Sequence, residues 1–411
     1  MRRALPVLIG FMLAGGCAAV GPDYQPPEVK LPPRWASPLA GGTSNRPASL
    51  AGWWKTFNDS KLDSLIGRAE QSNLDLQLAG ARILEARGQQ REIATQIWPT
   101  VDTSASYTRE RVSENGSLPL PPGTSPKFDL YDVGFDASWE LDVFGGTRRA
   151  IEAANAQVAA AEYDRRDVLV SLLAEVARNY IEVRGFQQRL AIAHRNIQAQ
   201  QEVLAITQDR YRAGLTSELD VQQATALLAT TQSQLPLLET GLRQAIYRLG
   251  VLLGRPPGAL LDELSSPGAI PAPPSQVPVG LPSELLRRRP DIQRAEREVA
   301  AATARIGVAV AELFPRFSLT GTAGFQSISA GDWLTGGSRF WSIGPTVQWR
   351  LFDAGRTRAA IDVERTRQDQ ALVSYQRTVL ASLEEVENAL TAYAREQTRR
   401  QTLAMAVQAN R

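Results

Sequence analysis

Residues 133–141 read VGFDASWEL, with apolar side chains at the odd-numbered positions and glycine, serine or acidic residues at the even-numbered ones. Alternation with a period of two is typical of a β-strand that has one apolar face. Residues 317–325 and 341–351 alternate in the same way, and residues 101–110 do so more weakly. The sequence therefore predicts four strands, at about 100–110, 132–142, 316–326 and 340–351.

The apolar faces of these strands favour contact with lipid. Alternation over nine to eleven residues, with aromatic side chains toward the ends, is what a tilted membrane-spanning strand requires. A half-buried sheet in a soluble domain would alternate equally well, but helices too long for a compact core flank each strand pair. The side chains that we expect to face lipid are Phe135, Trp139, Phe317, Phe325, Trp341 and Trp349.

The longest helices are predicted from a stretch without proline between Gly146 and Pro236. Gly214 is typical of a helix C-terminus, and Ser217 and Asp220 have the spacing of a capping box that begins a new helix. The first helix would extend roughly 100 Å at 1.5 Å per residue, a length typical of coiled coils and tunnel walls. We expect helices at 146–213 and 217–254 that reverse direction at 213–217.

Proline-rich segments separate the remaining parts. Residues 17–58 are predicted to be an extended N-terminal segment, and a helix begins near Ser60, where Asp63 completes a second capping box, and stops at Pro99. Residues 255–282 contain eight prolines and are predicted to be a linker. The linker separates a first repeat at 59–254 from a second at 283–411, whose long helix starts at 356.

The two segments on either side of the linker share one pattern. Asn73-Leu74-Asp75-Leu76 corresponds to Arg289-Pro290-Asp291-Ile292 at a spacing of 289 − 73 = 216 residues. Further matches are Trp98-Pro99 with Phe314-Pro315, Trp139 with Trp349, and Gly146-x-x-Arg149 with Gly355-x-x-Arg358. The order helix, strand, strand, glycine-rich turn, long helix predicts an internal duplication of an α+β membrane protein.

The N-terminus has the features of an exported protein. Arg2 and Arg3 precede an apolar run that is too short to span a bilayer, so residues 1–16 are predicted to be a signal peptide. The small residues before Cys17 are similar to the cleavage box of bacterial lipoproteins, although Ala14 stands where that box usually has leucine. We expect acylation of Cys17, including palmitate, and outer-membrane sorting because Ala18 is not aspartate. An ordinary signal peptide with an unrelated cysteine is the alternative.

Composition argues against an enzyme, a metal centre and a nucleic-acid partner. The chain contains one Cys and one His, so metal sites that need several such ligands are excluded, and Cys–His or Ser–His–Asp machinery is excluded unless His194 serves. His194 lies in a polar helical stretch and is predicted to be exposed. The formal net charge is +2, which gives no electrostatic reason to bind nucleic acid. We expect no catalytic residues, no metal and no cofactor.

Four strands cannot close a barrel, and an open sheet in a bilayer leaves unpaired backbone groups that each cost several kcal/mol. The sequence therefore predicts an oligomer whose copies share one barrel. Two, three or four copies would supply eight, twelve or sixteen strands, and a lumen wide enough for solutes argues against eight.

The chain resembles the outer membrane factor family of TolC-like efflux channels, in its NodT/OprM-like lipoprotein branch. Several motifs carry the resemblance: Cys17 with Gly21-Pro22-Asp23-Tyr24-x-x-Pro27; Trp53-Trp54-x-x-Phe57; Arg210-Tyr211-x-x-Gly214-Leu215-x-Ser217 with Asp220-Val221; Leu252-Leu253-Gly254-Arg255-Pro256; and Arg287-Arg288-Arg289-Pro290-Asp291-Ile292. The similarity extends over essentially the whole chain after residue 17.

The resemblance implies a homotrimer with a twelve-stranded barrel in the outer membrane and an α-helical tunnel, an α-barrel, in the periplasm. It implies passive conduction of drugs or other small molecules, hence multidrug resistance, with a periplasmic adaptor and an inner-membrane pump as partners. In this family the helix reversals form the closable aperture and meet the adaptor. The residues that this assigns here are Arg210, Tyr211, Gly214, Leu215, Ser217 and Asp220.

The second repeat departs from the family pattern. It has no counterpart of residues 210–254, because the chain stops at Arg411, roughly 50 residues short of a complete repeat. We expect the sequence to be a fragment, since a trimeric tunnel lacking one helix per subunit would have open walls.

Two other functions are compatible with the same residues. One is an outer-membrane conduit for protein secretion, and the other is a periplasmic coiled-coil scaffold lipoprotein without a pore. A heat-modifiable trimer that conducts ions would support a channel, whereas a soluble monomer after lipid removal would support the scaffold.

Overall fold

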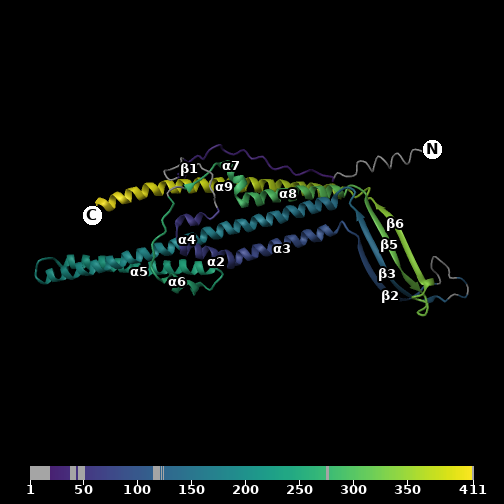
Figure 1. Ribbon diagram of the computed structural model, residues 1–411, viewed down its shortest axis with the longest axis horizontal. Coiled ribbons are helices and arrows are strands. Elements are labelled where there is room, and N and C mark those ends of the chain that lie inside the picture. The colour runs from purple at the N-terminus through teal and green to yellow at the C-terminus, as the bar shows by residue number, and fades with distance from the viewer. Residues whose placement is uncertain are drawn as a thin grey trace. The chain divides into compact units, whose positions relative to one another are not determined.

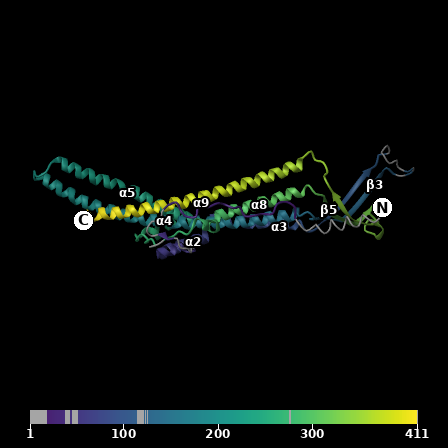
Figure 2. The ribbon, with the colours of Figure 1, turned by 90° about the horizontal axis from the view of Figure 1, so that it is seen from above.

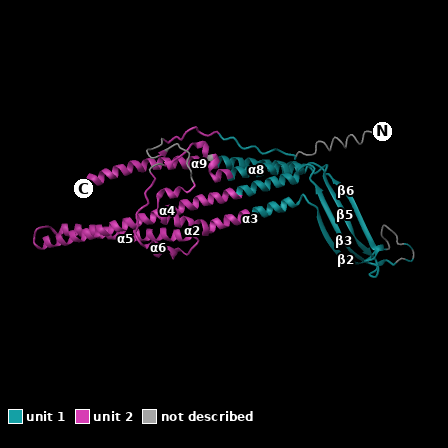
Figure 3. Cartoon of the chain, viewed as in Figure 1, with its two compact units in different colours: residues 1–29, 84–160, 294–377 teal, residues 30–83, 161–293, 378–411 magenta. Residues whose placement is uncertain are grey.

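The computed structural model describes residues 19–37, 43–44, 51–113, 121, 123, 125–274 and 277–409. The chain divides into two compact units, shown in different colours in Figure 3. Unit 1 comprises residues 1–29, 84–160 and 294–377, and unit 2 comprises residues 30–83, 161–293 and 378–411. Because the units draw on both predicted repeats, each repeat contributes a part to each unit.

Unit 1 contains the membrane-strand candidates as one antiparallel four-stranded sheet with the order β2-β3-β5-β6 (Figure 1). Alternating side chains in each strand produce two chemically different faces. Among the described residues β2 and β6 are the edges of this sheet. The strands are β2 at Thr100–Arg111, β3 at Lys127–Leu141, β5 at Arg316–Ser327 and β6 at Arg339–Gln348.

Two strand boundaries differ from the predicted ones. β3 begins at Lys127 instead of 132, because Phe128 and Leu130 break the alternation but still pair with β2. β6 ends at Gln348 instead of 351. Its partner there is Arg316, and the residue before Arg316 is Pro315, which has no N–H to continue the ladder.

The helices that belong to unit 1 pack through small side chains. They are the C-terminal part of α3 (Leu74–Thr95), the start of α4 (Gly146–Arg212), most of α8 (Pro290–Ala311) and the first part of α9 (Arg356–Ala409). Ala153 and Ala154 of α4 and Ala301 and Ala304 of α8 are buried. Alanine at such positions lets helix backbones approach closely without loss of helix propensity.

Unit 2 contains the helical hairpin made by α4 and α5 (Glu218–Leu252), which Figures 1 and 2 both show as two antiparallel helices. α4 contains 67 residues, about 100 Å of helix. Pro236 lies inside α5. The helices end within one or two residues of the expected positions.

The core of unit 2 forms where α2 (Ser60–Ser72) packs on α4 and the end of α5. Leu62, Leu65, Ile66 and Ala69 are each fully buried, so the predicted apolar stripe of α2 is the face that packs. The prediction that residues 255–282 are only a linker was wrong. This segment forms η2 (Pro257–Leu260) and α6 (Leu261–Ser265), whose Leu260 and Leu264 complete the core.

The expected single helix from Ser60 to Pro99 is two helices, α2 and α3, separated at Asn73. The Asn73 side chain is buried, accepts the Leu76 N–H at 2.9 Å and donates to the Leu252 carbonyl at 2.9 Å. The break therefore has a capped start for α3. The proposed capping box at Ser60 was also wrong, because Asp59 caps α2 by accepting from the N–H groups of Lys61 and Leu62.

Short elements complete the described chain. They are β1 (Thr43–Ser44) paired in parallel with β4 (Val277–Pro278), η1 (Trp53–Phe57), α7 (Pro282–Arg288) and η3 (Gly336–Ser338). In the part of the chain that the structure describes, none of the helices combines the length and apolar character needed to cross a bilayer.

Candidate functional site

The two faces of the sheet follow from its register. Partners across an antiparallel ladder point to the same side. Phe135 pairs with Thr103 and Ala323, and Ala323 pairs in turn with Trp341, so these four side chains form one row across the sheet. The next row on the opposite face contains Asp102, Asp136, Thr322 and Ser342. One face is therefore mainly apolar, and the other carries hydroxyl groups and carboxylates.

The structure brings the residues that were predicted to face lipid to the same side of the sheet. Phe135, Trp139, Phe317, Phe325 and Trp341 all occupy the apolar register, and Trp349 lies one residue beyond the end of β6. Phe135 is 60% exposed and Trp341 is 76% exposed. Large aromatic side chains in this environment need a covering that the described part of the chain does not supply. Contact with lipid stays a prediction.

Aromatic side chains lie at both ends of the sheet. At the end joined to the helices, Trp139 Nε1 donates to the Ile97 carbonyl at 2.9 Å and Trp349 Nε1 donates to the Leu313 carbonyl at 3.1 Å. At the other end the rings of Tyr107 and Tyr131 lie 5.0 Å apart, and Trp333 lies 5.7 Å from Tyr131. Rings with one polar atom at both limits of an apolar band are typical of membrane interfaces.

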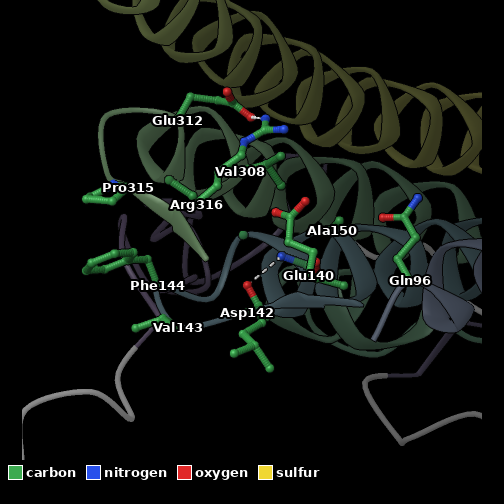
Figure 4. Close-up of a pocket in the computed structure, with 14 residues that line it drawn as sticks. Gln96, Glu140, Asp142, Val143, Phe144, Ala150, Val308, Glu312, Pro315 and Arg316 are labelled. Carbon is green, nitrogen blue, oxygen red and sulfur yellow. Dashed lines mark hydrogen bonds and ion pairs between the residues drawn. The ribbon is translucent and has the colours of Figure 1, made fainter. Parts of the chain in front are cut away.

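A cavity of about 290 Å³ opens where the sheet meets its helices (Figure 4). Glu140 and Gln96 line it, as do Asp142, Glu312 and Arg316. Asp142 accepts the N–H groups of Thr147 at 3.0 Å and Arg148 at 2.9 Å, so its carboxylate caps the start of α4. Glu312 forms an ion pair with Arg316. These charged groups hold the junction between helix and strand together and do not form a nucleophile–base pair.

The helix reversal has the geometry of a Schellman motif. Gly214 has φ +73°, its N–H donates to the Tyr211 carbonyl at 2.9 Å, and the Leu215 N–H donates to the Arg210 carbonyl at 2.8 Å. These are the two bonds that define the motif, and its left-handed residue is usually glycine. The structure thereby brings together four of the six predicted aperture residues.

The predicted capping box at the start of α5 is confirmed. Ser217 Oγ accepts the Asp220 N–H, and the Asp220 carboxylate accepts from the Ser217 N–H at 3.0 Å and the Thr216 hydroxyl at 2.5 Å. Hydrogen bonds from the Thr216 and Ser217 hydroxyls hold the pKa of Asp220 below its ordinary value. The reversal is exposed, with Leu215 at 69% and Leu219 at 64%. Asp220 is therefore an ionised side chain at an exposed helical tip.

Cys17 lies outside the described residues, but the structure describes the neighbouring segment from Ala19 onward. Arg149, in the first turn of α4, is buried and contacts Asp23 at 2.6 Å. The sequence pattern identified Arg149 only as part of the repeat and Asp23 only as part of a family motif. The signal that could have connected them is an arginine on a small-residue helix face that also contains Ala150, Ala153 and Ala154.

Comparison with known proteins places this geometry in a family. Residues 65–255 and 281–411 match the family model described as "Outer membrane efflux protein". Nodulation protein T of Rhizobium leguminosarum bv. trifolii is 32% identical over 385 residues, which are 94% of this chain and 80% of that protein. The toluene efflux pump outer membrane protein TtgI of Pseudomonas putida is 34% identical over 394 residues, covering 95% and 82%.

A solved structure of the outer-membrane channel OprN is similar at a TM-score of 0.86 with 38% identity, covering 95% of this chain and 86% of that one. The family resemblance predicted from the motifs is thus confirmed, as is the outer-membrane location. The family and the solved neighbours are channel proteins rather than enzymes. The chain belongs to the outer membrane efflux protein family and is an outer-membrane efflux channel.

Proposed function

We propose that three copies of this chain form one twelve-stranded barrel, with the apolar faces of the sheets toward lipid and the polar faces toward a water-filled lumen. The observation that carries the proposal is a sheet with two chemically opposite faces and two open edges, β2 and β6. Open edges are costly in hydrocarbon, and pairing of β6 with β2 of the next copy removes them. The solutes would be drugs or other small molecules that pass without any chemical reaction.

The aromatic ends give the proposed barrel its position in the bilayer. Along β3 the distance from Tyr131 to Trp139 is eight residues, or about 26 Å at 3.3 Å per residue. With strand tilt this is somewhat less than the apolar band of about 25 Å that membrane barrels present. The indole and phenol groups would then lie at the two lipid–water interfaces.

The helical hairpin would form part of the periplasmic tunnel, with its reversal as the aperture and as the contact with an adaptor. The exposed Leu215 and Leu219 supply apolar contacts, and the ionised Asp220 supplies charge. Relatives named as toluene efflux pump outer membrane protein and pyoverdine export outer membrane protein support an inner-membrane pump as the energy source. Acylation of Cys17 would add a lipid anchor beside each barrel sheet.

Two neighbouring residues of β6 provide the sharpest test. Ile343 lies on the apolar face and is 67% exposed, whereas Ser342 lies on the polar face. Ile343→Arg places a charge in lipid, which costs about 2–4 kcal/mol near the bilayer midplane in membrane barrels. We expect Ile343→Arg to lose the heat-modifiable trimer from outer-membrane fractions. Ser342→Arg should assemble and change only single-channel conductance in planar bilayers.

The opposite pattern would refute the orientation of the faces. Equal tolerance of both substitutions, with normal amounts of trimer, would show that the sheet does not contact lipid. A preparation of wild-type trimer that conducts no ions in planar bilayers would refute the channel itself and favour a scaffold.

A further inference from the structure

The N-terminal segment after Cys17 lies in a slot made by α4 and α8 within unit 1. Arg149 forms the floor of this slot, because its side chain is buried and donates to the carbonyls of Val20 at 3.1 Å, Ala19 at 3.4 Å and Gly21 at 3.3 Å. The same guanidinium contacts Asp23 at 2.6 Å and Glu152 at 2.8 Å. One buried cation thus binds successive carbonyls and a carboxylate of the same extended segment.

Three glycines give the slot its shape. Gly21 has φ +89°, and a Cβ there would come within 2.4 Å of the Gly307 Cα. A Cβ on Gly307 would lie 2.7 Å from Arg149 Cγ, and a Cβ on Gly145 would lie 2.5 Å from the Ala19 Cβ. Such close approach of backbones is possible only without side chains. The slot is therefore fitted to this one segment.

Further hydrogen bonds hold the N-terminal segment, some within unit 1 and some within unit 2. In unit 1, the Tyr24 hydroxyl donates to Glu296 at 2.9 Å, and the Val20 N–H donates to the Phe144 carbonyl at 3.0 Å. In unit 2, Glu387 accepts the N–H groups of Ala36 at 2.6 Å and Ser37 at 2.9 Å. A cation, Arg149, therefore binds carbonyl groups near the start of the segment, and an anion, Glu387, binds amide groups near its end.

The second repeat supplies a natural contrast. Its equivalent of Arg149 is Arg358, in the same Gly-x-x-Arg motif at the start of α9, and Arg358 is exposed. The position that corresponds to Gly307 at the spacing of 216 residues is Arg91 on α3 (307 − 216 = 91). A Cβ on Gly355 would meet no atom within 4 Å. In the described residues, the corresponding positions of the second repeat therefore do not form such a slot.

We propose that Arg149 is the positioning residue for the acylated N-terminus, holding the lipid attachment point beside the helical end of the membrane sheet. Ala19 is two positions after Cys17 in the sequence, so the chain length between them limits the distance between their Cα atoms to about 7 Å. Ala19 contacts Gly145, which follows the end of β3 at Leu141 by four residues. The acyl chains therefore enter the leaflet next to the girdle formed by Trp139 and Trp349. This inference rests on the proposed acylation and membrane insertion.

The test measures the segment directly by hydrogen–deuterium exchange in purified full-length trimer, on peptides that cover residues 19–29. In Arg149→Ala we expect amide exchange in these peptides to rise by about tenfold or more, because several charge-assisted hydrogen bonds are lost. Arg358→Ala is the matched control from the second repeat and should leave exchange of these peptides unchanged. Asp23→Asn removes only the segment's own carboxylate and should give a smaller rise.

The depth of the anchor is measured on the same variants with a spin label on Ala18→Cys in lipid vesicles, because Cys17 is the only native cysteine. We expect one narrow depth from collisional relaxation in wild type and a broad distribution in Arg149→Ala. Unchanged exchange and depth in Arg149→Ala, or an equal rise in Arg358→Ala, would overturn the proposal. If Arg149→Ala forms no trimer, Asp23→Asn decides, since the Asp23 carboxylate is exposed.

Planar-bilayer conductance of these preparations separates the two proposals. A wild-type trimer that conducts ions while its residues 19–29 exchange without protection refutes the role of Arg149 and keeps the channel. A wild-type trimer that conducts nothing, while Arg149→Ala still raises exchange of these residues, refutes the channel and keeps the role of Arg149.

Discussion

One helix and one strand of the first half have counterparts of equal length in the second half, but the two helices have different surroundings. α3 and α8 each contain 22 residues, β2 and β5 each contain 12, and both pairs start 216 residues apart (290 − 74 and 316 − 100). α8 nevertheless buries a continuous series of small side chains, whereas α3 buries only Leu76 and Ala79. The duplication preserved the elements, and single residues such as Gly307 and Arg149 decide what packs on them.

The same contrast appears where the two helices begin. Asn73 gives α3 a neutral cap, while the corresponding Arg289 lies between Asp291 at 2.9 Å and Glu385 at 2.6 Å. Ser382 of α9 adds a hydroxyl 3.4 Å from Asp291. The start of α3 is thus held by a neutral amide, and the start of α8 by a network of charged side chains. Only the charged network depends on pH.

The largest effect is expected at the reversal between α4 and α5, which has no described counterpart along α9. Gly214→Pro removes the N–H that bonds the Tyr211 carbonyl and demands φ near −65° where the backbone has +73°. We expect cells to lose drug resistance while the heat-modifiable trimer persists. Wild-type resistance in cells that make normal amounts of the variant would contradict the assignment of this reversal to the aperture.

Two glycine substitutions compare α8 with α3 directly. Gly307→Ala forces a methyl group against Arg149 and should destabilise the trimer by about 1–3 kcal/mol through overpacking. Gly88→Ala on α3 meets open space and should stabilise by about 0.5–1 kcal/mol through helix propensity. Thermal midpoints of the SDS-resistant trimer measure both. Shifts of equal sign would show that the two helices have similar environments in the assembly.

The ion network predicts an acid-sensitive difference between the halves. Burial by itself would raise the pKa of Asp291, but hydrogen bonds from Arg289 and its charge outweigh burial and hold that pKa below its ordinary value. The ionised Asp291 carboxylate therefore stabilises the folded protein fully above its unfolded pKa of about 3.9. This stabilisation is lost as the pH falls through the lower pKa that Asp291 has in the folded protein.

Asp291→Asn should lower stability near neutral pH by about 1–3 kcal/mol and make the decline below about pH 4 shallower. Denaturation of the trimer followed by circular dichroism between pH 7 and 3 provides the measurement. Asn73→Ala is the comparison in the first half and should destabilise equally at every pH. An Asp291→Asn profile parallel to wild type would show that this carboxylate is not linked to folding.

The smallest effect concerns a contact that both halves share. Trp139 Nε1 donates to the carbonyl of Ile97, which lies just before Trp98-Pro99 and β2. Trp349 Nε1 donates in the same way to the carbonyl of Leu313, just before Phe314-Pro315 and β5. Trp139→Phe and Trp349→Phe should each cost about 0.5–1.5 kcal/mol, the value of one hydrogen bond, and lower the thermal midpoint equally. Clearly unequal shifts would show that the two girdle positions differ in their lipid or water contacts.

The features that were predicted correctly depend on residues that lie close together in the sequence. Alternation in VGFDASWEL identified the face of β3 because strand side chains alternate strictly, and the Ser217–Asp220 spacing identified the cap of α5 because both residues belong to one turn. The break at Asn73 was missed because its partner, Leu252, is 179 residues away. The Arg149–Asp23 contact was missed for the same reason, at a separation of 126 residues. The core positions of Leu260 and Leu264 were missed because the surrounding prolines predicted a linker.

The open edges of the sheet have a consequence for how the protein reaches its membrane. Among the described residues, the outer edges of β2 and β6 have no partner strand, and in the proposed barrel they would pair with other copies, so a single chain would have no stable inserted state there. Entry into the bilayer and association then become one kinetic event. The rate of insertion should rise more steeply than linearly with protein concentration, and dilution should favour the uninserted chain.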